Sequence, residues 1–173
     1  MKTGIALIGF MGTGKTAVGR LLAARLGKTF IELDEEIEKA AGKSIADIFR
    51  EQGESRFREM EAEAVEKFSG RKNVVIACGG GIVTNETNIF RLRQEYVIVC
   101  LKAGLADIIK RTGGNTRPLL NVADRKKKIK ELLAARRPLY KRAADLTIDT
   151  TGIDAPAVAE KILRALGSYE DKH

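Results

Sequence analysis

Residues 9–16 of the chain read GFMGTGKT, which places three glycines, a lysine and two threonines within eight positions. An apolar run, GIALIG, ends where this segment begins, and an amphipathic helical pattern follows it. Gly9, Gly14, Lys15 and Thr16 satisfy the pattern G-x-x-x-x-G-K-[ST] in the strand-then-helix setting that it requires. The chain is therefore expected to begin as a strand, a glycine-rich loop and a helix.

The residue types of this loop suit the binding of phosphate groups. Glycines let successive backbone N–H groups form a concave nest, and the helix start adds unpaired N–H groups and a positive dipole end. Lys15 is expected to contact the β- and γ-phosphates of a nucleotide, and the Thr16 hydroxyl to bind Mg²⁺. The alternative is a turn without a ligand, but the flanking strand and helix favour a nucleoside triphosphate site.

The composition indicates one compact domain over residues 1–173. A chain of this length with 44% hydrophobic residues can bury one core but is short for two. No apolar run reaches the roughly 18 residues of a membrane span, and the N-terminus lacks a signal-peptide pattern, so we expect a cytoplasmic protein. Cys78 and Cys100 end apolar runs and should be buried thiols rather than a disulfide or a metal site.

The only histidine of the chain, His173, is its last residue. We therefore expect no Ser/His triad, no histidine general base and no histidine-rich metal site. Any acid–base chemistry must instead use carboxylates or lysine.

The net charge of +8 is distributed unevenly along the chain. Residues 102–142 contain 13 Lys and Arg against 3 Asp and Glu, whereas residues 32–66 contain 5 against 12. A nucleic-acid-binding protein usually shows a continuous basic face with aromatic or motif support, and only 5% of this chain is aromatic. The basic segment is expected to be a solvated helix face or to meet a small polyanion. Nucleic-acid binding remains a remote alternative.

Five short apolar runs rich in valine and isoleucine alternate with helical patterns. The runs predict strands at residues 4–9, 30–33, 74–78, 96–101 and 146–149. The first helix should end at Gly27 and bury a stripe of Val18, Leu21, Leu22 and Leu26. Further helices are expected at residues 44–53, 55–68, 124–142 and 155–166. This alternation predicts an α/β fold whose parallel sheet is covered on both faces and binds ligands at the carboxyl ends of its strands.

Residues 111–125, RTGGNTRPLLNVADR, are glycine-rich, contain an Arg-Pro step and are expected to form a long loop. Loops of this length inside compact domains are usually lids or binding loops. We expect a mobile lid over about residues 112–125, with Gly113 and Gly114 as hinges. Arg117 is then either part of a site under the lid or an exposed side chain of a flexible loop.

A second magnesium contact should come from a carboxylate at a strand end, but the run VVIAC continues into glycines. Glu32 and Asp34 lie two residues apart at the end of the second predicted strand, where alternation would turn both side chains to one face. Beside a phosphate site they are candidates for binding magnesium and substrate. The alternative is a polar strand end, with Asp34 as the cap of the next helix.

Arg136 falls on the apolar stripe of the helix predicted at residues 124–142. The other members of that stripe are Ile129, Leu132, Leu133 and Tyr140. An inward guanidinium needs an anionic partner. The alternative is an arginine at the edge of the stripe, with its charged end in water.

Two further features have competing interpretations. Arg58 lies at helical spacings from Glu54 and Glu61, which favours a surface ion pair. The three glycines at residues 79–81 follow a predicted strand. They form either a tight turn or a backbone that exposes N–H groups to a ligand.

Six segments in a fixed order resemble the shikimate kinases, which belong to the nucleoside monophosphate kinase-like group of P-loop proteins. They are GFMGTGKTAVGRLLA, FIELDEEIEKAAGKSIADIF, GESRFREMEAEAV, ACGGGIV, RTGGNTRPLL and RRPLYKRAADLTIDT. The resemblance covers nearly the whole chain. It implies transfer of the ATP γ-phosphoryl group to the 3-hydroxyl of shikimate, a step toward chorismate and the aromatic amino acids. It also implies a three-layer α/β/α fold with a five-stranded parallel sheet of order 2-3-1-4-5.

The resemblance further implies roles for individual residues. The catalytic residues would be Lys15, Asp34 and Arg117. ATP would be bound by Gly12, Thr13, Gly14, Lys15, Thr16, Arg111, Arg117 and Pro156. Shikimate would be bound by Asp34, Arg58, Gly79, Gly80, Gly81 and Arg136, with a helical substrate-binding region at about residues 33–61. Mg²⁺ would be bound directly by Thr16 and through a water by Glu32, where the family commonly has aspartate.

Phosphoryl transfer fits a chain without a usable histidine, because its rate comes mainly from positioning and electrostatic stabilisation. Gluconate and a nucleoside monophosphate remain alternative acceptors, since arginines that clamp a carboxylate would also suit gluconate. We expect a monomer that binds small molecules and has neither a nucleic-acid nor a membrane partner.

Overall fold

The computed structural model describes residues 2–114 and 117–171, and its centre is a five-stranded sheet. The strands are β1 (Gly4–Gly9), β2 (Thr29–Glu32), β3 (Val74–Ala77), β4 (Tyr96–Lys102) and β5 (Leu146–Asp149). All strand pairs are parallel and the order is β2-β3-β1-β4-β5. Both the predicted sheet order and the predicted strands are confirmed, the latter to within one residue at each end.

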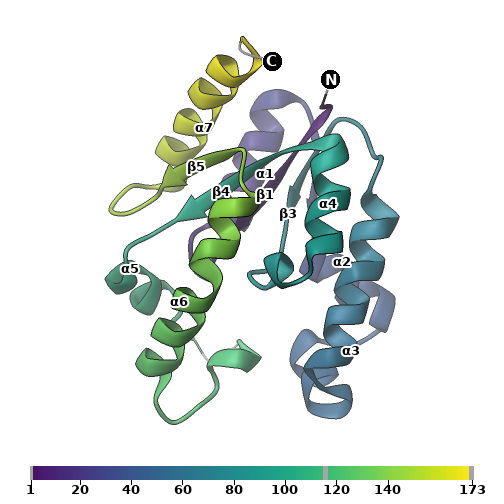
Figure 1. Ribbon diagram of the computed structural model, residues 1–173, viewed down its shortest axis with the longest axis vertical. Coiled ribbons are helices and arrows are strands. Elements are labelled where there is room, and N and C mark those ends of the chain that lie inside the picture. The colour runs from purple at the N-terminus through teal and green to yellow at the C-terminus, as the bar shows by residue number, and fades with distance from the viewer. Residues whose placement is uncertain (1, 115–116, 172–173) are drawn as a thin grey trace.

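Helices cover both faces of the sheet, as Figure 1 shows with α4 and α6 in front of it and α1 behind. One face packs against α1 (Lys15–Leu26) and α7 (Ala155–Glu170). The other face packs against α2 (Leu33–Ala41), α3 (Ile45–Phe68), α4 (Glu86–Glu95), α5 (Leu105–Arg111) and α6 (Arg125–Ala143). Two single-turn 3₁₀ helices, η1 (Ile82–Thr84) and η2 (Pro118–Leu120), complete the structure. The three-layer prediction is confirmed.

The central strand β1 explains why the sequence begins with an uninterrupted apolar run. Ile5 and Leu7 join the core under α1 and α7, whereas Ala6 and Ile8 join the core on the opposite face. A strand that is buried on both faces carries apolar residues at every position instead of alternating. Because all strands are parallel, the loops that follow β1, β2 and β3 meet at one edge of the sheet.

The chain turns into a helix one residue earlier than predicted after β2. Glu32 ends the strand and Leu33 begins α2, so Asp34 lies in the first turn of a helix. Strand alternation therefore does not orient Glu32 and Asp34, and that part of the prediction is wrong. Asp34 is not the helix cap either, because Glu32 holds the N-cap position without a side-chain hydrogen bond.

The helix α3 contains the break predicted at Gly53. The Ser44 side chain accepts a hydrogen bond from the Asp47 N–H at the start of α3, and Gly53 has φ +81° and ψ 172°. These dihedrals lie outside the helical region and need a residue without Cβ. The segment thus consists of two helices that meet at a kink, and the predicted helices at residues 44–53 and 55–68 are confirmed.

Other helices differ in detail from the prediction. Leu26 is 37% exposed at the end of α1, so its assignment to the buried stripe is wrong. The helix α7 continues to Glu170, four residues beyond its predicted end. The helices α4 and α5 were not predicted, because each buries only a few side chains and shows no extended apolar stripe.

Two further expectations concern the cysteines and membrane spans. Cys78 and Cys100 are free and buried, as predicted. Within residues 2–114 and 117–171, no helix is long and apolar enough to cross a membrane. His173 lies outside the described residues.

Candidate active site

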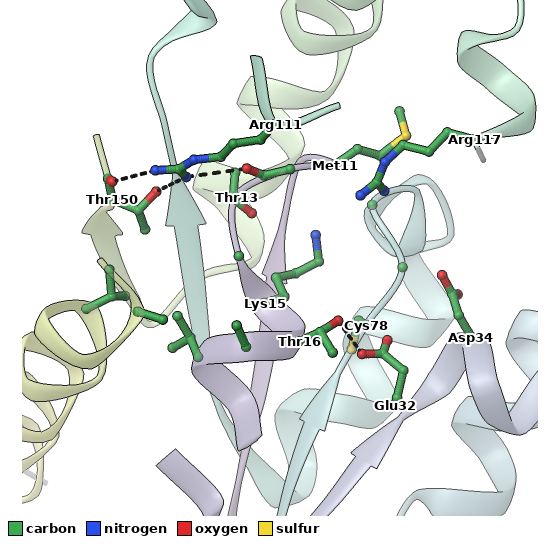
Figure 2. A pocket seen from close by; sticks show the side chains of 18 of the residues that line it. Met11, Thr13, Lys15, Thr16, Glu32, Asp34, Cys78, Arg111, Arg117 and Thr150 are labelled. Atoms are coloured by element: carbon green, nitrogen blue, oxygen red, sulfur yellow. Dashed lines mark hydrogen bonds between the residues drawn. The ribbon is translucent and has the colours of Figure 1, made fainter. Parts of the chain in front are cut away.

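A cavity of about 510 Å³ opens at the carboxyl edge of the sheet, around the loop between β1 and α1. We call it the P-loop cavity. Figure 2 shows Lys15, Glu32 and Asp34 directed into it, with Arg117 reaching toward them from the opposite wall. The cavity also exposes backbone of Gly12, Thr13 and Gly14 and the first turn of α1.

The glycines of the loop adopt backbone conformations that other residues rarely reach. Gly9, Gly12 and Gly14 have φ values of +143°, +79° and +92°. A Cβ on Gly9 would overlap the Leu101 carbonyl oxygen, and one on Gly12 would lie 2.8 Å from Thr112 Cγ2. Glycine is therefore required here both by the dihedral angles and by close packing.

The Lys15 side chain is held against the loop by hydrogen bonds to backbone carbonyl groups of that loop. Its Nζ donates hydrogen bonds to the carbonyl oxygens of Gly9 (2.7 Å) and Phe10 (2.9 Å). Burial lowers the pKa of Lys15 to about 8, and the Arg117 guanidinium contributes further in the same direction. An anion in the cavity would reverse both effects, since it would stabilise the ammonium form.

Thr16 and Glu32 form a pair at the base of the P-loop cavity. The Thr16 hydroxyl donates a hydrogen bond of 2.5 Å to Glu32 Oε2. Burial raises the pKa of the Glu32 carboxyl, which the Thr16 hydrogen bond opposes. The two side chains thus present oxygen atoms, the ligands that Mg²⁺ prefers, to the same point of the cavity.

Asp34 has a buried carboxylate oxygen that lacks a partner. Among the residues described, nothing hydrogen-bonds to its Oδ1 or to Glu61 Oε2. A Cβ on Gly79 would lie 3.0 Å from each of these oxygens, so both carboxylates converge where only glycine leaves room. Burial raises the pKa of Asp34, and the Lys15 ammonium opposes this. A buried acceptor without a partner is a candidate contact for a ligand hydroxyl.

A second cavity of about 590 Å³ adjoins the first and contains Arg58 and Arg136, so we call it the arginine cavity. Arg58 Nη1 donates to Glu61 Oε1 at 2.9 Å, and Nη2 donates to Glu54 Oε1 at 3.2 Å. Glu61 is only 1% exposed, so the predicted surface ion pair is correct for Glu54 and wrong for Glu61. A Cβ on Gly81 would overlap the Arg58 guanidinium, which therefore depends on this glycine.

Arg136 faces inward, as its helical stripe predicted, and is 4% exposed. Its Cζ lies 5.9 Å from the centre of the Phe10 ring, and Tyr140, one turn further along α6, donates a hydrogen bond from its hydroxyl to the Gly80 carbonyl. No carboxylate of the described chain forms an ion pair with Arg136. The anionic partner expected from the sequence is therefore not a protein group in this structure, which points to a ligand.

The two cavities meet at a shared boundary. Met11, Asp34, Gly79, Gly80 and Arg117 line both of them. Desolvation lowers the pKa of the half-buried Arg117 guanidinium, and Asp34 opposes this. Two ligands bound side by side would therefore meet between one carboxylate and one guanidinium.

Comparisons with known proteins identify the family of the chain. The shikimate kinase family model matches residues 11–167. A shikimate kinase from Thermodesulfovibrio yellowstonii is 50% identical over 161 residues, which are 92% of this chain and 92% of that protein. The chain belongs to the shikimate kinase family.

Solved structures of the family match over nearly the whole fold. A shikimate kinase from Acinetobacter baumannii in complex with shikimate is 39% identical, covers 98% of this chain and 95% of its own, and has a TM-score of 0.94. A shikimate kinase from Aquifex aeolicus is 34% identical and has a TM-score of 0.85. The match covers 96% of this chain and 98% of that protein's chain. As a member of this family, the chain is an ATP-dependent kinase that phosphorylates an alcohol group.

Arg111 and Pro156, both expected to bind ATP, differ in their position relative to the P-loop cavity. Arg111 Nη2 donates to the Thr150 carbonyl (3.2 Å), Nη1 donates to the Gly12 carbonyl (3.4 Å), and the side chain lines the P-loop cavity. Pro156 is exposed in the first turn of α7 and does not line that cavity, which Ile153 and Val158 line on this side. The structure therefore does not bring Pro156 into the candidate site.

Sequence reasoning missed two residues that support this kinase site. Glu61 was treated only as a surface partner of Arg58, and Tyr140 only as a member of an apolar stripe. Glu61 lies on the buried face of α3 with Phe57, Ala64 and Val65, and that position was the available signal. The contact of Tyr140 with Gly80 joins residues that are 60 positions apart, so no local pattern could indicate it.

Proposed function

We propose that the chain transfers the γ-phosphoryl group of ATP to the 3-hydroxyl of shikimate, with ATP in the P-loop cavity and shikimate in the arginine cavity. One observation carries this assignment. Two adjoining cavities, one built on phosphate-binding backbone and one containing a buried guanidinium without an anionic partner, share Asp34 and Arg117. An anionic acceptor with hydroxyl groups would thus lie directly beside the triphosphate.

In this proposal the triphosphate is bound by the backbone of Gly12, Thr13 and Gly14 and by the start of α1. Lys15 exchanges its hydrogen bonds with Gly9 and Phe10 for bonds to phosphate oxygens. The phosphate charge raises the pKa of Lys15, so the ammonium stays protonated during transfer. Arg111 lines the same cavity and would contact the adenine of ATP. Because the transferring group carries charge on its equatorial oxygens, the Lys15 ammonium would accelerate the reaction by stabilising that charge.

Thr16 and Glu32 fit a magnesium ion, and we propose that they hold one with ATP. The Thr16 hydroxyl would bind Mg²⁺ directly and Glu32 through a water, since Mg²⁺ keeps several waters in such sites. When bound, the ion neutralises charge on the β- and γ-phosphates. Burial raises the pKa of Glu32 although the Lys15 ammonium opposes this, and a divalent ion would oppose it further.

Shikimate carries one carboxylate and three hydroxyl groups, and the arginine cavity offers matching groups. Arg58 and Arg136 would bind the carboxylate with planar guanidinium donors. The backbone of Gly79, Gly80 and Gly81 would line the ring. Asp34 would accept a hydrogen bond from the attacking hydroxyl through its unpartnered Oδ1 and receive its proton late in the transfer.

We further propose that residues 112–125 close over the two substrates and bring Arg117 against the transferring phosphate. Of this segment, residues 115 and 116 lie outside the described part of the chain. Closure would exclude water, strengthen the interactions of Lys15 and Arg117, and suppress hydrolysis of ATP. Residues 33–61 would form the substrate-binding region, which includes Asp34, Arg58 and Glu61.

We also propose that residues 1–173 act as one domain and as a monomer in the cytoplasm. Among the described residues, the large exposed apolar side chains are Leu26, Phe90 and Val122. They lie on separate elements, and isolated exposed apolar residues do not make a stable interface. The two free thiols fit a reducing compartment.

The assignment of the acceptor can be tested with the purified protein, ATP and Mg²⁺. Shikimate, gluconate and a nucleoside monophosphate are supplied separately, ADP release is followed in a coupled assay, and ³¹P NMR identifies the phosphorylated position. We expect rapid ADP release with shikimate alone and a phosphate at its 3-position. Equal or faster turnover with gluconate or the nucleotide would overturn the proposal.

Arg136→Lys should raise the KM for shikimate about tenfold and leave the KM for ATP nearly unchanged. Lysine keeps the positive charge but loses the planar pair of donors that matches a carboxylate. Steady-state kinetics with each substrate varied in turn measures both constants. If both KM values rise equally, Arg136 stabilises the fold around Phe10 rather than binding the substrate.

Gly81→Ala tests the packing of Arg58. Gly81 has φ −94°, so alanine causes no backbone strain, but its Cβ would displace the Arg58 guanidinium. We expect the KM for shikimate to rise about tenfold with little change for ATP. The matched control is Gly167→Ala in α7, where an added Cβ meets nothing within 4 Å. An unchanged KM for shikimate in Gly81→Ala would argue against a role of Arg58 in binding.

A further inference from the structure

The glycine segment after β3 forms a β-turn whose central carbonyl is held by a side chain from another element. The Ile82 N–H donates to the Gly79 carbonyl (3.1 Å), which closes a four-residue turn. The carbonyl of the next residue, Gly80, accepts a hydrogen bond from the Tyr140 hydroxyl of α6. Among the described residues, the N–H groups of Gly80 and Gly81 have no acceptor. The turn thus has its central carbonyl bonded and two of its donors free.

The peptide between Gly80 and Gly81 is the central peptide of this turn, and glycine leaves its orientation free. Gly81 has φ −94° and ψ 6°, the values of the third residue in a type I turn. Rotation of the central peptide by about 180° would give a type II turn, which needs a positive φ at that residue and therefore favours glycine. A Cβ on Gly81 would oppose this rotation, but it would overlap the Arg58 guanidinium. The local sequence therefore permits two opposite orientations of one peptide.

Tyr140 selects one of these two orientations. It is 6% exposed, lines neither the P-loop cavity nor the arginine cavity, and donates its hydroxyl to the Gly80 carbonyl. Burial raises the pKa of this hydroxyl, so it stays protonated and remains a donor. Because C=O and N–H point in opposite directions in a trans peptide, the Gly81 N–H points away from Tyr140. A rotated peptide would lose the hydrogen bond of a buried hydroxyl, which is costly.

The same peptide lies between the two arginines that are proposed to bind the shikimate carboxylate. A Cβ on Gly80 would lie 3.5 Å from Arg136 Nη1, whereas one on Gly81 would overlap the Arg58 guanidinium. Both glycines and both arginines line the arginine cavity. A backbone donor at this position would therefore meet the same carboxylate as the two guanidinium groups.

We propose that Tyr140 is a positioning residue, which holds the central peptide of the turn so that the Gly81 N–H donates a hydrogen bond to the carboxylate of the acceptor. This inference rests on the proposed function, which places shikimate in the arginine cavity. The N–H adds a donor of fixed direction to those of Arg58 and Arg136, and hydrogen bonds to a carboxylate are among the stronger ones. Without the Tyr140 hydroxyl, the peptide is free to turn its carbonyl toward the carboxylate, and the two would repel each other. ATP should be little affected, because Gly81 does not line the P-loop cavity.

Tyr140→Phe tests this inference, because it keeps the ring and removes only the hydroxyl. We expect the KM for shikimate to rise about tenfold, with kcat and the KM for ATP nearly unchanged. Steady-state kinetics with each substrate varied in turn measures these constants, and thermal denaturation measures the stability of the variant.

The matched control is Tyr96→Phe, which removes another buried hydroxyl that donates to backbone carbonyls. Tyr96 bonds to the carbonyls of Phe68 (2.6 Å) and Arg71 (3.0 Å) and begins β4, at the end of the sheet away from the substrate cavities. Both variants should lose some thermal stability, whereas only Tyr140→Phe should show the split between the two KM values. Equal KM values for shikimate in the two variants, or an equal rise of both KM values in Tyr140→Phe, would overturn the inference.

NMR of the wild type reports on the hydrogen bond itself. In ¹H–¹⁵N spectra of the full chain, saturating shikimate should shift the Gly81 amide proton downfield, and this shift should be smaller in Tyr140→Phe. A Gly81 amide that does not respond to shikimate in an active wild type would overturn the inference alone. Absence of shikimate turnover in the wild type would instead overturn the proposed function, and this inference with it. The two failures are therefore distinguishable.

Discussion

Lys15→Ala is expected to lower kcat about 100-fold or more, which is the usual cost of removing one preorganised group that stabilises transition-state charge. Lys15 Nζ lies in the P-loop cavity with carbonyl oxygens as its only hydrogen-bond partners in the described chain. An ammonium in this position is available to a phosphate without breaking an ion pair. Alanine leaves the glycine nest intact, so the KM for ATP should change less than kcat.

The pH dependence of the wild type provides a second readout for Lys15. Because its pKa is lowered to about 8, the free protein loses the ammonium charge as the pH rises through that value. Since kcat/KM for ATP reports the free enzyme, it should fall above about pH 8, and this fall should be absent in Lys15→Ala.

The control for this prediction is Lys72→Ala. Lys72 is exposed and precedes β3, at the opposite edge of the sheet from the P-loop. It should retain wild-type kcat. Thermal denaturation should show that Lys15→Ala remains folded, because alanine suits the first turn of a helix and Lys15 forms no ion pair with any carboxylate of the described residues. Activity of Lys15→Ala within tenfold of the wild type would contradict the proposed role.

Asp34→Asn should lower kcat by about 100-fold, within the range for removal of a general base. The substitution keeps the size of the side chain but replaces a carboxylate oxygen with an amide. The attacking hydroxyl then loses both an orienting acceptor and the group that takes its proton. Because the pKa of Asp34 is raised by burial, wild-type activity should fall on the acid side at a pH above the ordinary aspartate range, and Asp34→Asn should lack this fall.

The matched control for Asp34→Asn is Glu36→Gln, on the same helix. Glu36 pairs with Lys39 and lines neither cavity. It should show wild-type kcat and an unchanged pH profile. A kcat for Asp34→Asn equal to that of Glu36→Gln would show that Asp34 neither orients nor deprotonates the acceptor.

Much of the fold could be predicted because its signals are local. The β1 strand, the loop at residues 9–16 and the kink at Gly53 each depend on residues close together in sequence, and all three were found. The predictions for Leu26 and for the end of β2 were wrong because burial and strand length depend on what packs against the segment. Asp34 reaches the site from the first turn of α2, although the strand pattern placed it one element earlier.

The candidate site was predictable to a different extent for each residue. Arg136 was recognised as inward from its stripe, and the structure adds that no protein carboxylate in the described residues pairs with it. Arg58 was expected to make a surface pair, whereas the structure places its Glu61 partner in the core. Pro156 was assigned from resemblance alone, and the turn that starts α7 leaves it exposed.

The sequence by itself determined the phosphate-binding loop, the five strands, the helices with clear apolar stripes, and the family, because these depend on residue types at short, fixed spacings. Only the tertiary structure decided that the Asp34 and Glu61 carboxylates converge at Gly79. It also decided that the Arg58 guanidinium packs against Gly81 and that the Tyr140 hydroxyl donates a hydrogen bond to the Gly80 carbonyl. Each of these contacts joins separate elements of the chain. Their geometry follows from how helices pack on the sheet, which sequence spacing does not specify.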